Sequence, residues 1–274
     1  ASFKETAQAT DQKGYRITLQ IPHYLAVLQY ADNRKLRETL YHAYVTRASE
    51  LDFEGKFNNN DVMKRIVELR AREASLLGYH NYGEVSLATK MANSPQEVVS
   101  FLRDLAQKSL PQAKADMAEV KTFAKEKLGI DDPQSWDLPY ASEKLREAQY
   151  AFSDQEVKQY FTLPAVFKGL FGLVQTLFNI RIVKDTAPVW HPDVQFFRIE
   201  NEKGEKIAQF YMDLYARANK RGGAWMDNDR TRNRLYGELQ TPVAYLVCNF
   251  AKPVGDKPAL LTHDDVLTLF HEFG

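Results

Sequence analysis

One predicted helix, about 50 Å long at about 1.5 Å per residue, limits the folding of this chain more than any other feature. Ser94-Pro95-Gln96-Glu97 combines an N-cap residue, a proline at the first helical position and a glutamate three residues after the cap. Apolar residues then recur at helical spacing until Gly129, a typical C-terminal signal. Because Pro111 lies within the run, we expect a kink there. The run predicts one long helix within a helical scaffold.

Other helices are predicted on both sides of this run. Asp32 is the expected N-cap of one helix, and Asn60 is that of a second helix that ends near Gly78. Residues 164–180 are so apolar that we expect them to form a buried helix. Residues 14–21 differ, because their apolar residues alternate and predict a short strand. Up to residue 180, the sequence therefore predicts mainly helices.

The pattern changes near Arg181, where short β-branched or alternating runs begin. These runs predict four strands, at residues 180–183, 194–200, 206–215 and 242–250. A glycine-containing turn separates the second and third strands, so we expect a hairpin there. The predicted fold class is α+β, mainly α with a small β-sheet. We expect residues 1–180 to form a helical domain and residues 181–274 to form the sheet and a last helix.

The predicted last helix, residues 261–274, carries His271 and Glu272. Thr262 and Asp265 resemble a capping box, and apolar residues follow at helical spacing. Residues four apart share one face of a helix, so the second histidine of an H-E-x-x-H zinc motif is due at position 275. We therefore expect the chain to be a fragment that stops inside this motif. A His-Glu pair alone also fits an exposed pair near a helix end.

Charge and composition exclude several classes of function. Lys plus Arg and Asp plus Glu number 36 each, so the formal charge is zero, which argues against a nucleic-acid partner. Cys248 is the single cysteine, which rules out an internal disulfide and fits a reducing compartment such as the cytoplasm. No apolar run is long enough to span a bilayer, so we expect no membrane partner.

Arg217, Lys220 and Arg221 form a small basic cluster. We expect this cluster to be solvated surface. The alternative is that it meets a substrate carboxylate.

Five strings near the C-terminal end carry a family resemblance: AQFYMDLYAR (208–217), KRGGAWM (220–226), TPVAYLVCNF (241–250), KPALLTHDD (257–265) and HEFG (271–274). Together, in this order, they resemble the thimet oligopeptidase family of zinc metallopeptidases. The resemblance implies a zincin-like fold in which the helical shell of residues 1–180 lines a narrow substrate channel. The sheet and the metal helix then form the floor of this channel. It also implies that short peptides are the substrates.

The same resemblance implies one Zn²⁺ in the full-length chain, with His271 as a ligand. A second histidine and a later glutamate are the other expected protein ligands, and both lie outside the 274 residues. We therefore expect neither tightly bound zinc nor peptidase activity in the fragment itself. In zincin-type peptidases, too, strands lead directly into a helix that bears a His-Glu pair. In these enzymes, a sheet edge can hold an extended peptide by strand addition.

The implied chemistry is metal-assisted hydrolysis of an amide. Zinc lowers the pKa of a bound water toward about 7, so a nearby carboxylate can take its proton at neutral pH. Glu272 follows a ligand but points elsewhere around the helix, which suits a general base. Two alternatives remain open at this stage. One is a dipeptidyl carboxypeptidase of the same family, and the other is a non-catalytic helical scaffold or partner-binding module.

Overall fold

In a computed structural model of the protein, the chain divides into two compact units. The structure describes residues 2–8, 10–52, 55–235 and 237–274. Val27–Leu145 forms one unit, here called the helical unit, and Ala1–Ala26 together with Arg146–Gly274 forms the other, here called the sheet unit. These units describe compactness, whereas the division predicted between residues 180 and 181 concerns function and stays a prediction.

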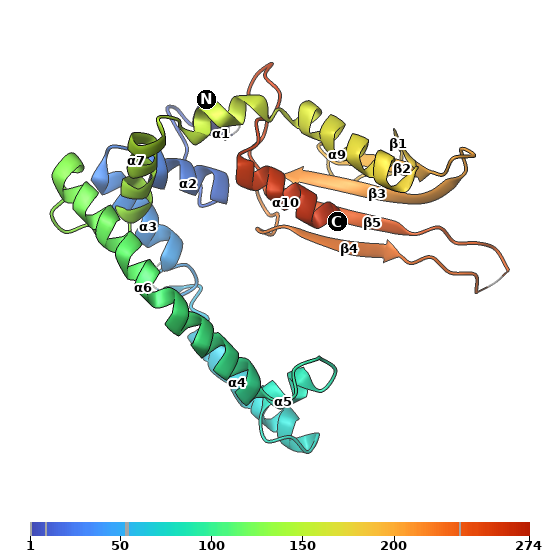
Figure 1. Cartoon of the computed structure of the whole chain (residues 1–274), viewed down its shortest axis with the longest axis horizontal. Helices are drawn as coiled ribbons and strands as arrows, with labels where there is room; N and C mark the ends of the chain where they lie inside the picture. The colour runs from blue at the N-terminus through green and yellow to red at the C-terminus, as the bar shows by residue number, and fades with distance from the viewer. Residues whose placement is uncertain (1, 9, 53–54, 236) are drawn as a thin grey trace. The chain divides into compact units, whose positions relative to one another are not determined.

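The described residues form a mixed α and β structure (Figure 1). The α-helices are α1 (Ser2–Gln8), α2 (Ile21–Tyr30), α3 (Arg34–Val45), α4 (Asn60–Leu76), α5 (Tyr82–Leu87), α6 (Pro95–Leu128), α7 (Leu138–Tyr150), α8 (Asp154–Val157), α9 (Leu163–Phe178) and α10 (His263–Phe273), with a 3-10 helix η2 (Lys158–Tyr160). The strands are β1 (Arg181–Lys184), β2 (Gln195–Glu200), β3 (Lys206–Tyr215), β4 (Trp225–Arg230) and β5 (Val243–Phe250). None of the described helices is long and apolar enough to cross a membrane.

The predicted long helix is α6, and local signals determine both of its ends. The Ser94 side chain accepts a hydrogen bond from the Glu97 backbone N–H at 3.1 Å, which caps the first turn. Gly129 ends the helix with φ of 68°, a left-handed conformation that glycine adopts without a steric cost. The helix continues through Pro111. The kink expected at that residue stays a prediction.

Three predictions for the N-terminal part are wrong. Asn60 is the first helical residue of α4, and the N-cap of this helix is Asn59. Residues 15–18 form no strand, and α2 begins at Ile21 instead. None of the described strands pairs with the alternating run, and Tyr15 is 74% exposed, so the run does not form one face of a sheet. The N-cap of α3 is Asn33, whose side chain accepts the Leu36 N–H at 3.0 Å. Asp32 instead accepts a hydrogen bond from the Tyr140 hydroxyl.

The five strands form one sheet in the order β1-β2-β3-β5-β4. β3 and β5 are parallel, and the other neighbouring pairs are antiparallel. The four predicted strands are confirmed as β1, β2, β3 and β5, and β2 and β3 form the expected antiparallel pair. β4 was not predicted. It pairs only with β5 among the described strands, so it forms one edge of the sheet.

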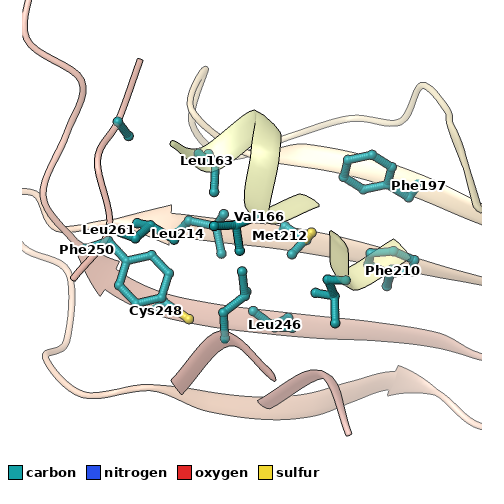
Figure 2. Close-up of a cluster of buried hydrophobic side chains, with 13 residues drawn as sticks. Leu163, Val166, Phe197, Phe210, Met212, Leu214, Leu246, Cys248, Phe250 and Leu261 are labelled. Atoms are coloured by element: carbon teal, nitrogen blue, oxygen red, sulfur yellow. The ribbon is translucent and has the colours of Figure 1, made fainter. Parts of the chain in front are cut away.

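One face of the sheet carries the hydrophobic core of the sheet unit, and α9 and α10 supply helical residues to that core (Figure 2). Alternate side chains of β3 and β5 point to this face because successive residues of a strand face opposite sides. The buried residues of the cluster are Leu163, Val166, Leu170, Phe197, Phe210, Met212, Leu214, Leu246, Cys248, Phe250, Ala259, Leu261 and Leu269. Full burial of one large apolar side chain contributes about 1.5–3 kcal/mol, so this cluster fixes both helices on the sheet.

The prediction of a buried helix at residues 164–180 holds for one face only. Leu170 of α9 is 2% exposed and lies in the core. Leu177 and Phe178, at the end of the same helix, are 66% and 68% exposed. The composition of the segment did not reveal this asymmetry, because apolar residues occur on both faces of α9.

Candidate active site

α10 carries His271 and Glu272, and its start is held by the predicted capping box. The Thr262 hydroxyl accepts the Asp265 N–H at 3.0 Å, and the Asp265 carboxylate accepts the Thr262 N–H at 2.9 Å. These bonds satisfy backbone donors that have no partner within the first turn. One turn later, Leu269 is fully buried in the core. Capping and burial together fix the direction of the helix.

The two candidate residues differ in their surroundings. His271 is exposed, whereas Glu272 is half-buried. Burial raises the pKa of the Cys248 thiol on β5 to about 12, and the Glu272 carboxylate adds to this rise. α10 contacts β5, the strand that carries Cys248. Adjacent positions on one helix therefore differ in exposure, with the imidazole in solvent and the carboxylate partly covered.

A zinc ion needs more donors than the described residues bring together. Zinc sites in enzymes normally use three protein ligands and leave one position for water. No group of three or more His, Cys, Asp or Glu side chains could hold a metal ion among the residues that the structure describes. The exposed imidazole of His271 has the donor chemistry that zinc prefers, but it supplies one ligand only. The described chain fits part of a zinc site and not a complete one.

β4 is the element of the candidate site that sequence reasoning missed. α10 contacts both β5 and β4, so the free edge of the sheet lies beside the helix that carries the His-Glu pair. The sequence of β4 is Trp-Met-Asp-Asn-Asp-Arg, and Asp and Asn are depleted in strands. Charged residues are nevertheless common on edge strands, because they discourage pairing with other chains. A polar, exposed segment can therefore be an edge strand, and β4 was missed because its sequence is polar.

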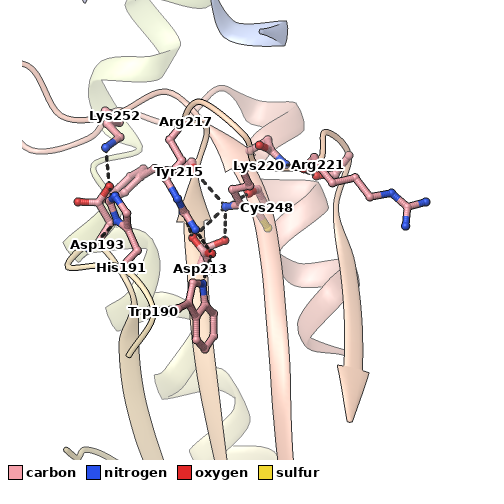
Figure 3. A network of polar contacts seen from close by, with 12 residues as sticks. Trp190, His191, Asp193, Asp213, Tyr215, Arg217, Lys220, Arg221, Cys248 and Lys252 are labelled. Carbon is pink, nitrogen blue, oxygen red and sulfur yellow. Dashed lines mark hydrogen bonds and ion pairs between the residues drawn. The ribbon is translucent and has the colours of Figure 1, made fainter. Parts of the chain in front are cut away.

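The basic cluster at residues 217–221 is only partly solvated, which corrects the prediction (Figure 3). The side chain of Lys220 is 5% exposed, and that of Arg217 is 16% exposed. Both bind the buried Asp213 carboxylate, at 2.9 Å and 2.6 Å respectively. Arg221 alone is exposed as expected. The prediction that all three residues are solvated is wrong because a buried carboxylate, here Asp213 on β3, needs cationic partners.

Asp213 is the centre of a network on the sheet face opposite the core. Burial alone would raise the pKa of Asp213, but hydrogen bonds from Arg217, Lys220 and the Trp190 indole outweigh burial and lower this pKa to about 2. Lys220 also donates to the backbone carbonyls of Tyr215 and Cys248, which belong to β3 and β5. The network therefore ties the loop after β3 to the two central strands. Its cations are occupied, which leaves them unsuited to bind a substrate carboxylate.

Comparison with known proteins agrees with the family resemblance. A family model described as Peptidase family M3 matches residues 27–274. Oligopeptidase A of Escherichia coli is 49% identical over 277 residues, which cover 100% of this chain and 41% of that protein. Organellar oligopeptidase A, chloroplastic/mitochondrial, of Arabidopsis thaliana is 44% identical over 284 residues, which cover 100% of this chain and 35% of that protein.

Dipeptidyl carboxypeptidase of Salmonella typhimurium is a relative whose name states a different activity. It is 37% identical over 274 residues, which cover 98% of this chain and 40% of that protein. The chain thus spans about two fifths of the length of the curated relatives it matches. Since the family match extends over most of the 274 residues and includes α10 and the whole sheet, the chain belongs to peptidase family M3.

Proposed function

We propose that the intact protein is a zinc-dependent endopeptidase that hydrolyses short oligopeptides, with His271 as a zinc ligand and Glu272 as the general base. One observation carries the proposal: this pair lies on a capped helix that contacts β5 and the edge strand β4. The names of the oligopeptidase A relatives support peptides as the substrates. Because the chain spans 41% of the Escherichia coli relative, the proposal concerns the longer protein.

His271 and Glu272 have different tasks because consecutive residues of a helix point about 100° apart. The exposed imidazole of His271 donates a ring nitrogen to the metal, and further protein donors come from the longer protein. When bound, zinc lowers the pKa of a coordinated water toward about 7 and polarises the scissile carbonyl. The Glu272 carboxylate takes a proton from the attacking water and then gives it to the departing amine. The core contacts of α10 hold the two side chains in place for these steps.

The peptide backbone binds along β4. An edge strand has unpaired backbone N–H and C=O groups, and an extended peptide can add to it as a further strand. β4 supplies such an edge beside α10. We extend the proposal to a zincin-like fold, to a helical shell at residues 1–180 that lines a substrate channel, and to a cytoplasmic location, which the single cysteine favours.

The test is Glu272→Gln in the intact, zinc-loaded protein, with a quenched fluorescent oligopeptide as substrate. We expect kcat to fall by about 10²–10⁴-fold, because the amide keeps the shape of the carboxylate but accepts no proton. The zinc content should stay unchanged, which metal analysis measures. Asp264→Asn is the matched control, since Asp264 is an exposed carboxylate in the first turn of the same helix. Peptide cleavage at the wild-type rate by the Glu272 variant would contradict the assignment.

A dipeptidyl carboxypeptidase is the second candidate function. The 37% identity to the Salmonella typhimurium dipeptidyl carboxypeptidase over 98% of this chain favours it as an alternative. Mass spectrometry of the products from one long peptide distinguishes the two activities. Internal cleavage products support the endopeptidase, whereas successive C-terminal dipeptides support the alternative.

A further inference from the structure

A pocket on the exposed face of the sheet combines three aromatic rings with one carboxylate. Its volume is about 290 Å³, and it is lined by Trp190, Trp225, Asp227, Tyr245 and Val247. Trp225 and Asp227 belong to β4, and Tyr245 and Val247 belong to β5. The strand register pairs Trp225 with Val247 and Asp227 with Tyr245, so the four side chains share one face of the sheet. This is the face opposite the core and α10, since Leu246 and Cys248 point into the core.

The aromatic walls of the pocket are held by polar bonds and ring contacts. The Trp190 indole N–H donates to Asp213 at 3.0 Å, which fixes the ring over the sheet (Figure 3). The Trp190 and Tyr245 rings meet edge to face with centroids 5.6 Å apart. The Tyr245 hydroxyl donates to Asp229 at 2.8 Å. The walls are therefore in place before any ligand binds.

Asp227 carries a negative charge that no cation neutralises within the described part of the chain. Its carboxylate accepts the Asn228 N–H at 2.8 Å, and none of the described cations forms an ion pair with it. Asp229, two residues further along β4, differs because Arg230 pairs with it at 3.3 Å. The pocket thus has one unpaired carboxylate beside electron-rich rings. Organic cations bind well to such a combination, because aromatic faces and a carboxylate both attract positive charge.

The Trp225 ring already attracts one guanidinium. Arg221 lies 5.7 Å from the centroid of this ring. Arg221 is not among the lining residues of the pocket, so the space beside Asp227 remains available to another group. The contact supports a guanidinium as a suitable occupant of the site.

We propose that this pocket is a specificity site that binds the side chain of an arginine or lysine in a peptide whose backbone is paired with β4. The proposal rests on the proposed function, because the peptide reaches the pocket by adding to this edge. Paired residues of neighbouring strands direct their side chains to the same face, with Cβ atoms about 4.5–5.5 Å apart. The peptide residue opposite Asp227 therefore directs its side chain toward the aromatic face. Arginine and lysine are long enough to cross β4 along apolar surface and place their charge in the pocket.

The experiment compares two N-acetylated peptides that differ only in arginine or citrulline at one position. Citrulline has the shape of arginine without its charge, and acetylation removes the terminal amine as a competing cation. A scan of the position along the peptide locates the subsite with the largest effect. For the intact zinc-loaded enzyme, we expect kcat/KM to be about 10-fold higher for arginine at that subsite. Asp227→Asn should reduce the preference to about 2-fold or less, chiefly through KM.

Asp229→Asn is the matched control. It removes one negative charge from the same face of the same strand, but that charge is already paired with Arg230. Asparagine also keeps an oxygen that can accept the Tyr245 hydroxyl. The arginine preference should therefore persist in this variant. The absence of a preference in the wild type, or its equal loss in both variants, would overturn the proposal.

A binding measurement separates failure of the pocket from failure of the proposed function. Calorimetric titration of the zinc-free intact protein with the same peptides needs no turnover. We expect tighter binding of the arginine peptide to the wild type and to the Asp229 variant, and a difference of about 2-fold or less between the two peptides for the Asp227 variant. If no peptide is cleaved, the proposed function fails, and this titration decides the pocket by itself.

Discussion

Asp137 in the helical unit and Asp213 in the sheet unit are buried carboxylates, and each binds two cationic side chains. The partners of Asp137 are Arg34 and Arg37, which precede it by 103 and 100 residues. Burial would raise the pKa of Asp137, but hydrogen bonds from both arginines and from a backbone N–H lower it below its ordinary value. This group of charges joins α3 to the segment that enters α7.

The partners of Asp213 are close in sequence instead. Arg217 and Lys220 follow Asp213 by four and seven residues. Their bonds shape one loop, and Lys220 extends the network to a carbonyl of β5. The difference teaches that buried charge groups of similar composition stabilise different levels of structure. One stabilises the contact between distant helical segments, and the other stabilises a loop over the sheet that already has its own core.

The largest expected effect that tests this comparison comes from Asp137→Ala. We expect the unfolding free energy of the helical unit to fall by about 3–5 kcal/mol, because the buried Arg37 loses its counter-charge. The Arg37 side chain is 1% exposed, so water cannot replace the carboxylate. Hydrogen exchange should show faster exchange of α3 amides. Asp213→Ala is the matched variant, and it should increase exchange in the loop at residues 217–223 while leaving α3 unchanged. Similar increases in both units after either substitution would break the comparison.

The second largest expected effect is a decrease in the unfolding free energy at acid pH. The pKa of Asp213 in the folded state is about 2, below the ordinary value of 3.8. Ionised Asp213 therefore stabilises the folded state fully when the pH is above 3.8. This contribution, about 2 kcal/mol, is lost as the pH falls through the interval toward the folded pKa. Urea unfolding from about pH 6 to about pH 2.5 should show a shrinking difference between the wild type and Asp213→Asn. A difference that stays constant over this range would contradict the ion-pair explanation.

The smallest effect separates the two arginines that bind Asp137. Arg34 is 49% exposed, so its replacement by alanine should cost less than about 1 kcal/mol. Arg37→Ala should cost several times more, because Arg37 is buried and also donates to the Ala31 carbonyl. Chemical denaturation of the two variants measures this ratio. Equal costs would show that exposure does not determine the contribution of each arginine.

Two helix caps were predicted correctly from neighbouring residues, whereas the caps predicted at Asp32 and Asn60 are each one residue from the observed position. The caps of α6 and α10 are correct because a side chain three residues away supplies the bond. The family was also identified correctly from strings around β3, β5 and α10. The roles of His271 and Glu272, and the absence of tightly bound zinc from the 274-residue chain, stay predictions. Both predictions depend on further zinc ligands, which we expect outside the 274 residues.

Signals that depend on distant residues were misread or missed. β4 is polar, and it is a strand only because β5 pairs with it. Lys220 resembles a surface residue by type, but the buried Asp213 draws it to the sheet. Residues 14–21 alternate like a strand, yet none of the described strands pairs with them. In each case the outcome depends on which segment lies beside the residue, and a local pattern does not contain that information.

The burial of Cys248 has a consequence for how the protein responds to oxidants and alkylating reagents. At a pKa of about 12, its sulfur remains protonated at neutral pH and is a poor nucleophile. The sulfur is fully buried in the core to which α10 contributes Leu269, so a reagent can reach it only when this core opens. Opening of the core at α10 would also displace His271 and Glu272, which belong to the same helix. Modification of the single thiol would therefore report on molecules in which the packing of α10 on the sheet has already opened.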